Sequence, residues 1–241
     1  MQLRVTIRIK DNLVLPVDYN YILQSMIYKA LGNNQEYSSL MHDQGFGNSG
    51  RSYKFFSFSR VEGQCFISDN KLVFKDSISF EVRSIIPQFI ILIYKYFQEE
   101  GCTFGRKRYR DVELKLEDRT IEQADLVVNM VSPVCVFSTD FDTKHTRYYN
   151  PGEDEFYTRI NNSFKSKYEA LYGIVPESNI RISKELVIRE DKMLTKYKGF
   201  LIEAWFGRYR IAGERKYLDF LYQTGIGSKT AQGFGLFEKE E

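Results

Sequence analysis

Apolar and polar residues alternate from the first residues of the chain, which predicts a strand with one buried face. The apolar members of this alternation are Leu3, Val5, Ile7 and Ile9. The spacing then changes to that of a helix over residues 18–31, which Asp18 is expected to cap and Gly32-Asn33-Asn34 to end. The residues predicted to face the core from this helix are Leu23, Met26, Ile27, Ala30 and Leu31.

Period-two alternation returns over residues 53–61 and 64–74, and we predict a strand pair with its turn at Glu62-Gly63. A helix is expected over residues 84–98. Its apolar run would suit a strand equally well, but its length and its position favour a helix. A strand over residues 108–116 completes the order β-α-β-β-α-β.

The same order of elements recurs after an acidic linker at residues 117–125. The predicted elements are a strand at 126–138 interrupted by Ser132-Pro133, a polar loop or hairpin at 140–150, a helix at 151–172, strands at 180–188 and 198–208, a helix at 214–223 and a strand at 233–238. The predicted fold is therefore α+β, with two tandem ferredoxin-like (RRM-like) βαββαβ domains. The N-terminal domain is expected over residues 1–120 and the C-terminal domain over residues 121–241.

Composition excludes several classes of protein. The chain has 241 residues, of which 43% are hydrophobic and 15% aromatic, so it can bury a core and is not disordered. The 34 Lys and Arg residues oppose 32 Asp and Glu residues, so net charge alone does not indicate a nucleic-acid partner. The three cysteines, Cys65, Cys102 and Cys135, form no CxxC pair, and neither a zinc site nor a redox dithiol is predicted.

The sequence further predicts a cytoplasmic protein without a membrane partner. The sparse, unpaired cysteines are typical of a reducing compartment. The first residues lack the apolar stretch of a signal peptide. The longest apolar run, at residues 89–94, is far shorter than the roughly 20 residues that a membrane-spanning helix needs.

A tyrosine, a histidine and a lysine occur where they could share a cleft. Tyr28 projects from the non-core face of the first helix, His42 follows that helix, and Lys54 opens the next strand. These three side-chain types can carry out metal-free transesterification of RNA, because the ribose 2′-hydroxyl must lose a proton, the 5′-oxygen must gain one and the phosphate needs a cation. Taken singly, Tyr28 would fit packing on a sheet and Lys54 a solvated strand. Lys29 and Arg51 are alternative cations.

The second histidine, His145, lies in a polar loop and is interpreted as a surface residue.

A doubled glycine pattern lies near the C-terminus, where residues 225–235 have the form G-h-G-x5-G-h-G with h apolar. Such pairs allow positive φ and a close approach of the backbone to phosphate, with N–H groups as donors. Lys229 in its centre adds a positive charge. The segment has neither the order of a Walker loop nor the position of a Rossmann loop.

The glycine segment resembles the signature loop of the RAMP superfamily of CRISPR-associated proteins. The N-terminal residues around Tyr28, His42 and Lys54 make the chain similar to the sixth Cas family, the endoribonuclease that processes CRISPR precursor transcripts. This resemblance implies cleavage within the repeat RNA without a metal or other cofactor, catalysed by His42, Tyr28 and Lys54. The products it implies carry a 2′,3′-cyclic phosphate or 3′-phosphate and a 5′-hydroxyl.

Charge is concentrated locally, since residues 181–229 hold 11 Lys and Arg against 6 Asp and Glu. The residues predicted to contact RNA are Gly225, Gly227, Lys229, Gly233, Gly235, Arg208 and Arg210. A second basic run at residues 106–110 fits either phosphate binding or an ordinary solvated surface. Trp205, Phe206 and Tyr209 fit either base stacking or the core, and for Trp205 the core is favoured.

Two alternative functions use the same segments. The first is a non-catalytic RNA-binding RAMP subunit of a CRISPR interference complex, in which His42 has no chemical role. The second is an enzyme that binds a phosphorylated small molecule in the glycine segment, and the sequence offers no nucleophile for it. The sequence leaves open whether the protein acts alone, as a homodimer or within a multi-subunit CRISPR interference complex.

Overall fold

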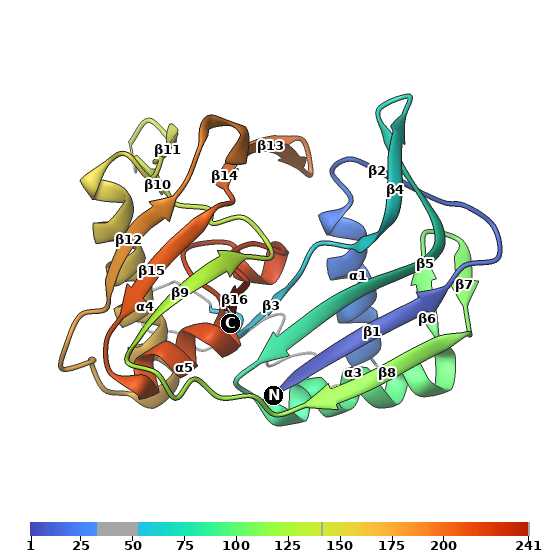
Figure 1. The fold of residues 1–241 in the computed structure, drawn as a ribbon, viewed down its shortest axis with the longest axis horizontal. Coiled ribbons are helices and arrows are strands. Elements are labelled where there is room, and N and C mark those ends of the chain that lie inside the picture. The colour runs from blue at the N-terminus through green and yellow to red at the C-terminus, as the bar shows by residue number, and fades with distance from the viewer. Residues whose placement is uncertain (33–52, 141, 241) are drawn as a thin grey trace.

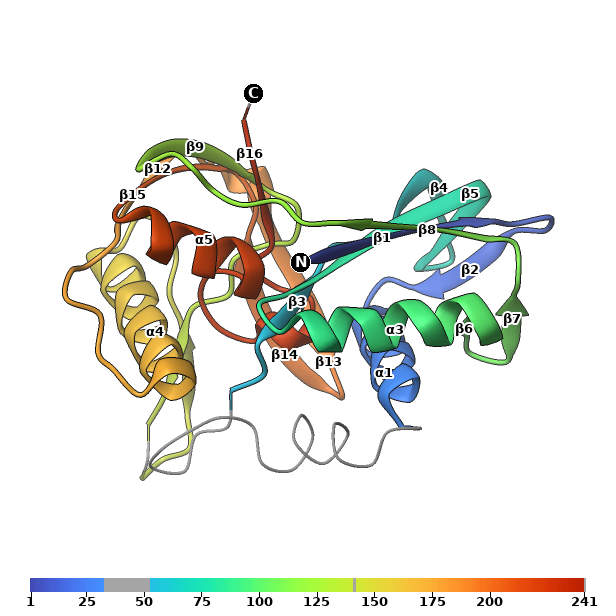
Figure 2. The same ribbon diagram turned by 90° about the horizontal axis from the view of Figure 1, so that it is seen from below.

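The computed structural model describes residues 1–32, 53–140 and 142–240, which form two antiparallel sheets, each with helices packed on one face (Figures 1 and 2). We call residues 1–120 the N-terminal half and residues 121–241 the C-terminal half. The strands of the first sheet are β1 (Gln2–Arg8), β2 (Leu13–Pro16), β3 (Phe56–Phe58), β4 (Glu62–Ser68), β5 (Lys71–Ser84) and β8 (Val112–Glu117). They lie in the order β2-β5-β1-β8, and β3 and β4 also pair with β5.

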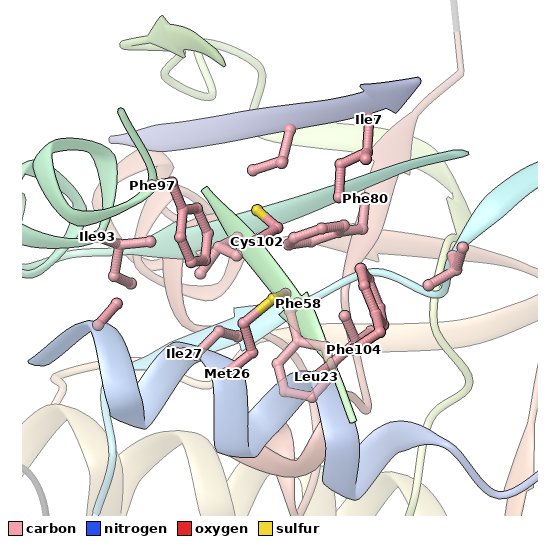
Figure 3. Close-up of a cluster of buried hydrophobic side chains, with 14 of the residues drawn as sticks. Ile7, Leu23, Met26, Ile27, Phe58, Phe80, Ile93, Phe97, Cys102 and Phe104 are labelled. Atoms are coloured by element: carbon pink, nitrogen blue, oxygen red, sulfur yellow. The ribbon is translucent and has the colours of Figure 1, made fainter. Parts of the chain in front are cut away.

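Helices α1 (Asn20–Leu31) and α3 (Pro87–Glu100) cover this sheet, as Figure 2 shows. The predicted α1 core stripe is confirmed, because all five of its residues are buried. The core between α1, α3 and the sheet also holds the aromatic rings and the thiol of the short hairpin β6 (Cys102–Phe104) and β7 (Lys107–Tyr109) (Figure 3). The helix predicted over residues 84–98 is confirmed as α3.

Two local predictions in this half are wrong. Asp18 does not cap α1: the residue before the helix is Tyr19, which is buried and accepts a hydrogen bond on its hydroxyl from the Val61 N–H at 2.8 Å. The hairpin turn lies at Asp69-Asn70 and not at Glu62-Gly63. Both turn residues have positive φ, 49° and 59°, which suits a two-residue hairpin turn and which Asp and Asn tolerate.

The second sheet has the order β12-β15-β9-β16. Its strands are β9 (Asp125–Met130), β12 (Arg181–Leu186), β15 (Arg208–Ala212) and β16 (Phe237–Lys239). Helices α4 (Asp154–Tyr172) and α5 (Arg215–Thr224) pack beneath it (Figure 2). The polar segment at residues 140–150 forms a hairpin, in which β10 (Phe137–Thr139) pairs with β11 (Thr146–Tyr148).

The strand predicted over residues 198–208 corresponds to β14 (Phe200–Trp205), but its predicted end is wrong. Gly207, with φ of +109°, separates β14 from β15, which was not predicted as a strand of its own. The unpredicted β13 (Lys192–Tyr197) pairs with β14 in a separate hairpin. In the same way, residues 108–116 divide between β7 and β8. At each division the strand changes its pairing partner and the alternation shifts by one residue: Ile202 and Ala204 are buried in β14, whereas Tyr209 and Ile211 are buried in β15.

Each half has its own hydrophobic core, and each core also contains a buried residue from the other half. Ala231 of the C-terminal half packs into the first core, and Phe55 of the N-terminal half packs into the second. The tandem ferredoxin-like architecture follows from these sheets and helices, while a boundary at residue 120 stays a prediction. Within the described ranges, no helix is long and apolar enough to cross a membrane.

Candidate RNA-binding cleft

A cleft of about 800 Å³ lies between the two halves. Its walls are the outer face of α1, residues 53–54, β10, the inner face of α4 and the glycine loop, which we define as residues 225–235. Four residues predicted from the sequence to act on or contact RNA line it: Tyr28, Lys54, Gly227 and Lys229. Two distant segments of the N-terminal half and one of the C-terminal half therefore meet here.

The glycines of the loop are required by close packing. A Cβ on Gly235 would lie 2.0 Å from the Ile226 carbonyl oxygen, and one on Gly233 would lie 2.4 Å from the Phe58 ring. Both residues also have positive φ, 76° and 82°. Only glycine fits such positions, since any side chain would need both the left-handed region and the occupied space.

Three of the four glycine N–H groups of the loop already donate to protein carbonyls, and contact of the loop glycines with RNA stays a prediction. The Gly225 N–H donates to the Leu221 carbonyl at 2.7 Å, Gly233 to Thr230 at 3.0 Å, and Gly235 to Pro133 at 2.9 Å. A group that already donates to a protein carbonyl is not available to a phosphate. The loop therefore shapes the cleft through its fold and supplies charge through Lys229.

Two polar side chains of α1 hold the glycine loop against the N-terminal half. Asn20 Nδ2 donates to the Gln232 carbonyl at 2.9 Å, and Gln24 Nε2 donates to the Ala231 carbonyl at 2.6 Å. The Tyr197 hydroxyl, at the end of β13, donates to Gln24 Oε1. Asn20 and Gln24 were not predicted from the sequence. Two amide side chains one turn apart on the same helix are a usable signal, because they can bind a neighbouring backbone segment together.

Two side chains of α4 hold the loop from the other side. Lys167 Nζ donates to the Gly225 carbonyl at 3.1 Å, and Ser163 Oγ donates to the Gly227 carbonyl at 3.1 Å. Burial lowers the pKa of Lys167 to about 7. Lys167 was not predicted, but it lies three residues after Phe164 on the apolar face of α4, which is an unusual place for a lysine.

Tyr28 lies at the boundary between the core and the cleft. Its ring packs edge-on against Phe56, with the centroids 5.9 Å apart. Burial, and secondarily the neighbouring Tyr197 hydroxyl, raise the pKa of Tyr28 to about 12. The phenol therefore keeps its proton at neutral pH and can donate it to a bound group.

Lys229 is held in a left-handed conformation with φ of +58°. Its ammonium lies 4.6 Å from the centroid of the Phe137 ring. The cations that line the cleft are Lys54, Arg159, Lys167 and Lys229. Among the described lining residues there is no Asp or Glu, so the cleft is suited to an anionic ligand.

The other predicted site residues lie elsewhere. Arg208 and Arg210 are on β15, outside the cleft lining, and form ion pairs with Glu240 at 3.1 Å and Asp125 at 2.9 Å. Their contact with RNA stays a prediction. His42, together with the alternative cation Arg51, lies outside the described residues.

Two segments whose role the sequence left open are now placed. The basic run at residues 106–110 is partly paired, because Lys107 contacts Asp11 at 3.1 Å and Arg108 contacts Glu100 at 2.7 Å. Tyr209 belongs to the second core.

In the part of the chain that the structure describes, no three His, Cys, Asp or Glu side chains lie together as a metal site would require.

Comparison with known proteins gives one family. The family described as CRISPR associated protein Cas6, C-terminal, matches residues 115–239. The CRISPR-associated endoribonuclease Cas6 1 of Methanocaldococcus jannaschii is 22% identical over 98% of this chain and 91% of that protein. The CRISPR-associated endoribonuclease Cas6 of Pyrococcus furiosus is 24% identical over 94% of this chain and 84% of that protein.

Solved structures show the same fold. The product of a Cas6-related gene from Pyrococcus furiosus superposes with a TM-score of 0.82 at 22% identity, covering 100% of this chain and 98% of that one. A structure described as an RAMP protein binding different RNA substrates gives a TM-score of 0.81, also at 22% identity, with 100% of both chains covered. These likenesses confirm the predicted tandem ferredoxin-like architecture.

Proposed function

We propose that this chain, which belongs to the Cas6 family of CRISPR-associated proteins, is an endoribonuclease that cleaves CRISPR precursor RNA within the repeat. The family match covers just over half of the chain, and relatives that align with nearly all of it are named as Cas6 endoribonucleases. The sequence resemblance pointed to the same family from the glycine pattern and from Tyr28, His42 and Lys54.

One observation carries the assignment of the site. Tyr28 and Lys54 from one half and Lys229 from the other line a single cleft whose described lining has no carboxylate. A polyanionic strand entering there would meet cations on both sides and a phenol that can donate a hydrogen bond. The small-molecule alternative loses its main support, because the N–H groups of Gly225, Gly233 and Gly235 already donate to protein carbonyls.

The proposed reaction needs no water molecule or metal in its first step. The ribose 2′-oxygen loses its proton and attacks the adjacent phosphorus, and the bond from phosphorus to the 5′-oxygen breaks. The leaving 5′-oxygen takes up a proton, so the products are a 2′,3′-cyclic phosphate and a 5′-hydroxyl. Lys54 would neutralise the charge that develops on the phosphate oxygens. Tyr28, still protonated, would act as a donor, and His42 as the group that exchanges protons near neutral pH.

Cleavage assays in EDTA test the proposal. Repeat RNA and the same RNA with one 2′-deoxynucleotide at the cut are each incubated with the protein. We expect cleavage of the first RNA, and binding without cleavage of the second, because only the first has the attacking oxygen. If both RNAs bind and neither is cut, the protein is the non-catalytic RNA-binding subunit instead.

Replacing each histidine in turn gives a matched pair of variants. His42→Ala should lower the cleavage rate by about 10²- to 10⁴-fold, the usual contribution of a general acid or base, while RNA affinity is retained. His145→Ala should leave the rate unchanged, since His145 is exposed in the loop between β10 and β11. Equal rates for the two variants would exclude His42 from the mechanism.

A further inference from the structure

A buried ammonium in the cleft is not used by the proposed chemistry. Lys167 is only 6% exposed, and toward the described residues its Nζ donates one hydrogen bond, to the Gly225 carbonyl at 3.1 Å. An ammonium has three N–H donors. Within the described residues no carboxylate forms an ion pair with Lys167, and desolvation is the cause that perturbs it. A buried positive charge without a counter-charge is unfavourable.

The described side chains that line the cleft with Lys167 are cationic or neutral. The titratable and charged groups that line the cleft with it are Tyr28 on α1, Tyr53 and Lys54 on the segment before β3, Arg159 on α4 and Lys229 on the glycine loop. Behind the loop lies the thiol of Cys135, whose pKa burial raises to about 12. Arg159 already pairs with Glu155 at 2.8 Å. Among the residues that the structure describes, the cleft therefore lacks the negative charge that would stabilise the protonated form of Lys167.

We propose that the cleft takes up a proton when it binds the phosphate backbone of RNA, and that Lys167 holds this proton. The inference rests on the proposed RNA function and adds to it a positioning residue and a link to pH. A phosphodiester over the cleft supplies the missing negative charge and favours the ammonium form. The ammonium in turn makes a stronger hydrogen bond to the Gly225 carbonyl than a neutral amine would, and so secures the glycine loop.

The size of the effect follows from the free protein. Because burial brings the pKa of Lys167 to about 7, about three quarters of the molecules carry the neutral amine at pH 7.5. If bound phosphate returns the pKa toward the ordinary range of lysine, binding takes up roughly 0.5–0.7 proton per RNA at this pH. Affinity should accordingly weaken as the pH rises above 7.

Calorimetric titration measures this uptake directly. Repeat RNA with all 2′-hydroxyls methylated and with hydroxyl ends cannot be cleaved by the proposed route, and it is titrated at pH 7.5 in buffers of different ionisation enthalpy. Wild-type protein should take up about 0.5 proton more than Lys167→Met. Lys229→Met, which removes a cation from the same cleft, should weaken binding and keep the uptake. His42 is present in all three proteins, so its contribution cancels in the difference.

A second measurement does not depend on the stability of a variant. The side-chain NMR signals of Lys167 are followed against pH in the wild-type protein, with and without the methylated RNA. The midpoint should rise by about one pH unit or more when RNA is bound. An unchanged midpoint, or equal uptake by wild type and Lys167→Met, overturns the inference.

The two proposals fail separately. If repeat RNA binds with uptake that depends on Lys167, but unmodified RNA is never cut, the endoribonuclease function is wrong and this inference stands. If unmodified RNA is cut while uptake does not depend on Lys167, only this inference is wrong. Absence of any RNA binding overturns both.

Discussion

Burial sets the protonation of the residues that face the cleft. Tyr28 and Lys167 have opposite charges when ionised, and in both the buried environment favours the neutral form, with pKa values of about 12 and about 7. Tyr28 is therefore a proton donor over the whole physiological range, whereas Lys167 changes its charge within it. These two properties could not be predicted from the sequence, since they depend on which neighbours remove water from each group.

Replacing Tyr28 by Phe tests its role as a donor. We expect the single-turnover cleavage rate to fall by roughly 10²-fold, because the phenol no longer donates a proton or hydrogen bond in the transition state. The pKa of Tyr28 is about 12. At every pH up to about 11 the phenol therefore keeps its proton, and its ionisation should not reduce the wild-type rate. Tyr21→Phe, on the exposed side of the same helix, is the control and should cleave at the wild-type rate.

A cleavage rate that rises with pH because of Tyr28 would contradict its role as a proton donor. If Tyr28 acted as the base, its contribution would need the phenolate, and the rate would rise about tenfold per pH unit through the alkaline range. Profiles of the same shape for wild type and Tyr28→Phe, with the Tyr28→Phe rate lower at every pH, fit the donor role. A Tyr28-dependent rise with pH would assign it as the base.

At the scale of elements, helices and edge strands differ in how well the sequence predicts them. The spacing of buried residues in α1, α3 and α4 identified these helices, because one face of each packs on a sheet. Strands were predicted from alternation but divided incorrectly, because the shift of the alternation by one residue at Gly207 was not recognised. The alternately buried residues are Ile202 and Ala204 before this glycine and Tyr209 and Ile211 after it. The polar pair Asp69-Asn70 was the available signal for the turn between β4 and β5.

The loop predicted from the glycine pattern lines the cleft, and close packing requires at least two of its glycines, Gly233 and Gly235. Gly235→Ala should lower the free energy of unfolding by about 3 kcal/mol, because it adds left-handed strain and a Cβ 2.0 Å from the Ile226 carbonyl oxygen. Gly199→Ala is the matched control, since Gly199 also has positive φ but a methyl group added there would meet no atom within 4 Å. Gly199→Ala should lower the free energy of unfolding by only about 1 kcal/mol, from backbone strain alone.

Urea denaturation of the two glycine variants measures the difference. Equal losses would mean that the contact with Ile226 contributes nothing and that only the backbone conformation matters. A larger loss for Gly235→Ala would confirm that the loop is held by close approach. Gly235→Ala should also lower the rate of RNA cleavage, since Lys229 is part of this loop.

For the whole molecule, the central feature is how the two halves are held together. Arg83 on β5 is fully buried and donates to the Phe237 carbonyl on β16 at 2.7 Å. Its guanidinium also forms ion pairs with Glu81 and Glu238 and lies 3.8 Å from the centroid of the Tyr222 ring. One side chain of the N-terminal half thereby joins a strand and a helix of the C-terminal half.

Arg83→Met should lower the free energy of unfolding by about 3–5 kcal/mol, because it leaves the buried Glu81 carboxylate without its partner. Arg4→Met removes an exposed ion pair with Glu62, which spans 3.7 Å, and should change stability by less than about 0.5 kcal/mol. Thermal and urea unfolding of both variants check this. A similar small change in both would show that Arg83 does not join the halves.

Analysis of the RNA ends tests the proposed reaction most directly. Repeat RNA is cleaved by the wild-type protein in EDTA, and the masses of both fragments are measured by mass spectrometry at early times. Attack by the 2′-oxygen predicts a 2′,3′-cyclic phosphate on the upstream fragment and a 5′-hydroxyl on the downstream fragment. A 3′-hydroxyl together with a 5′-phosphate would require attack by water from the other side of the phosphate, and it would contradict the mechanism assigned to this cleft.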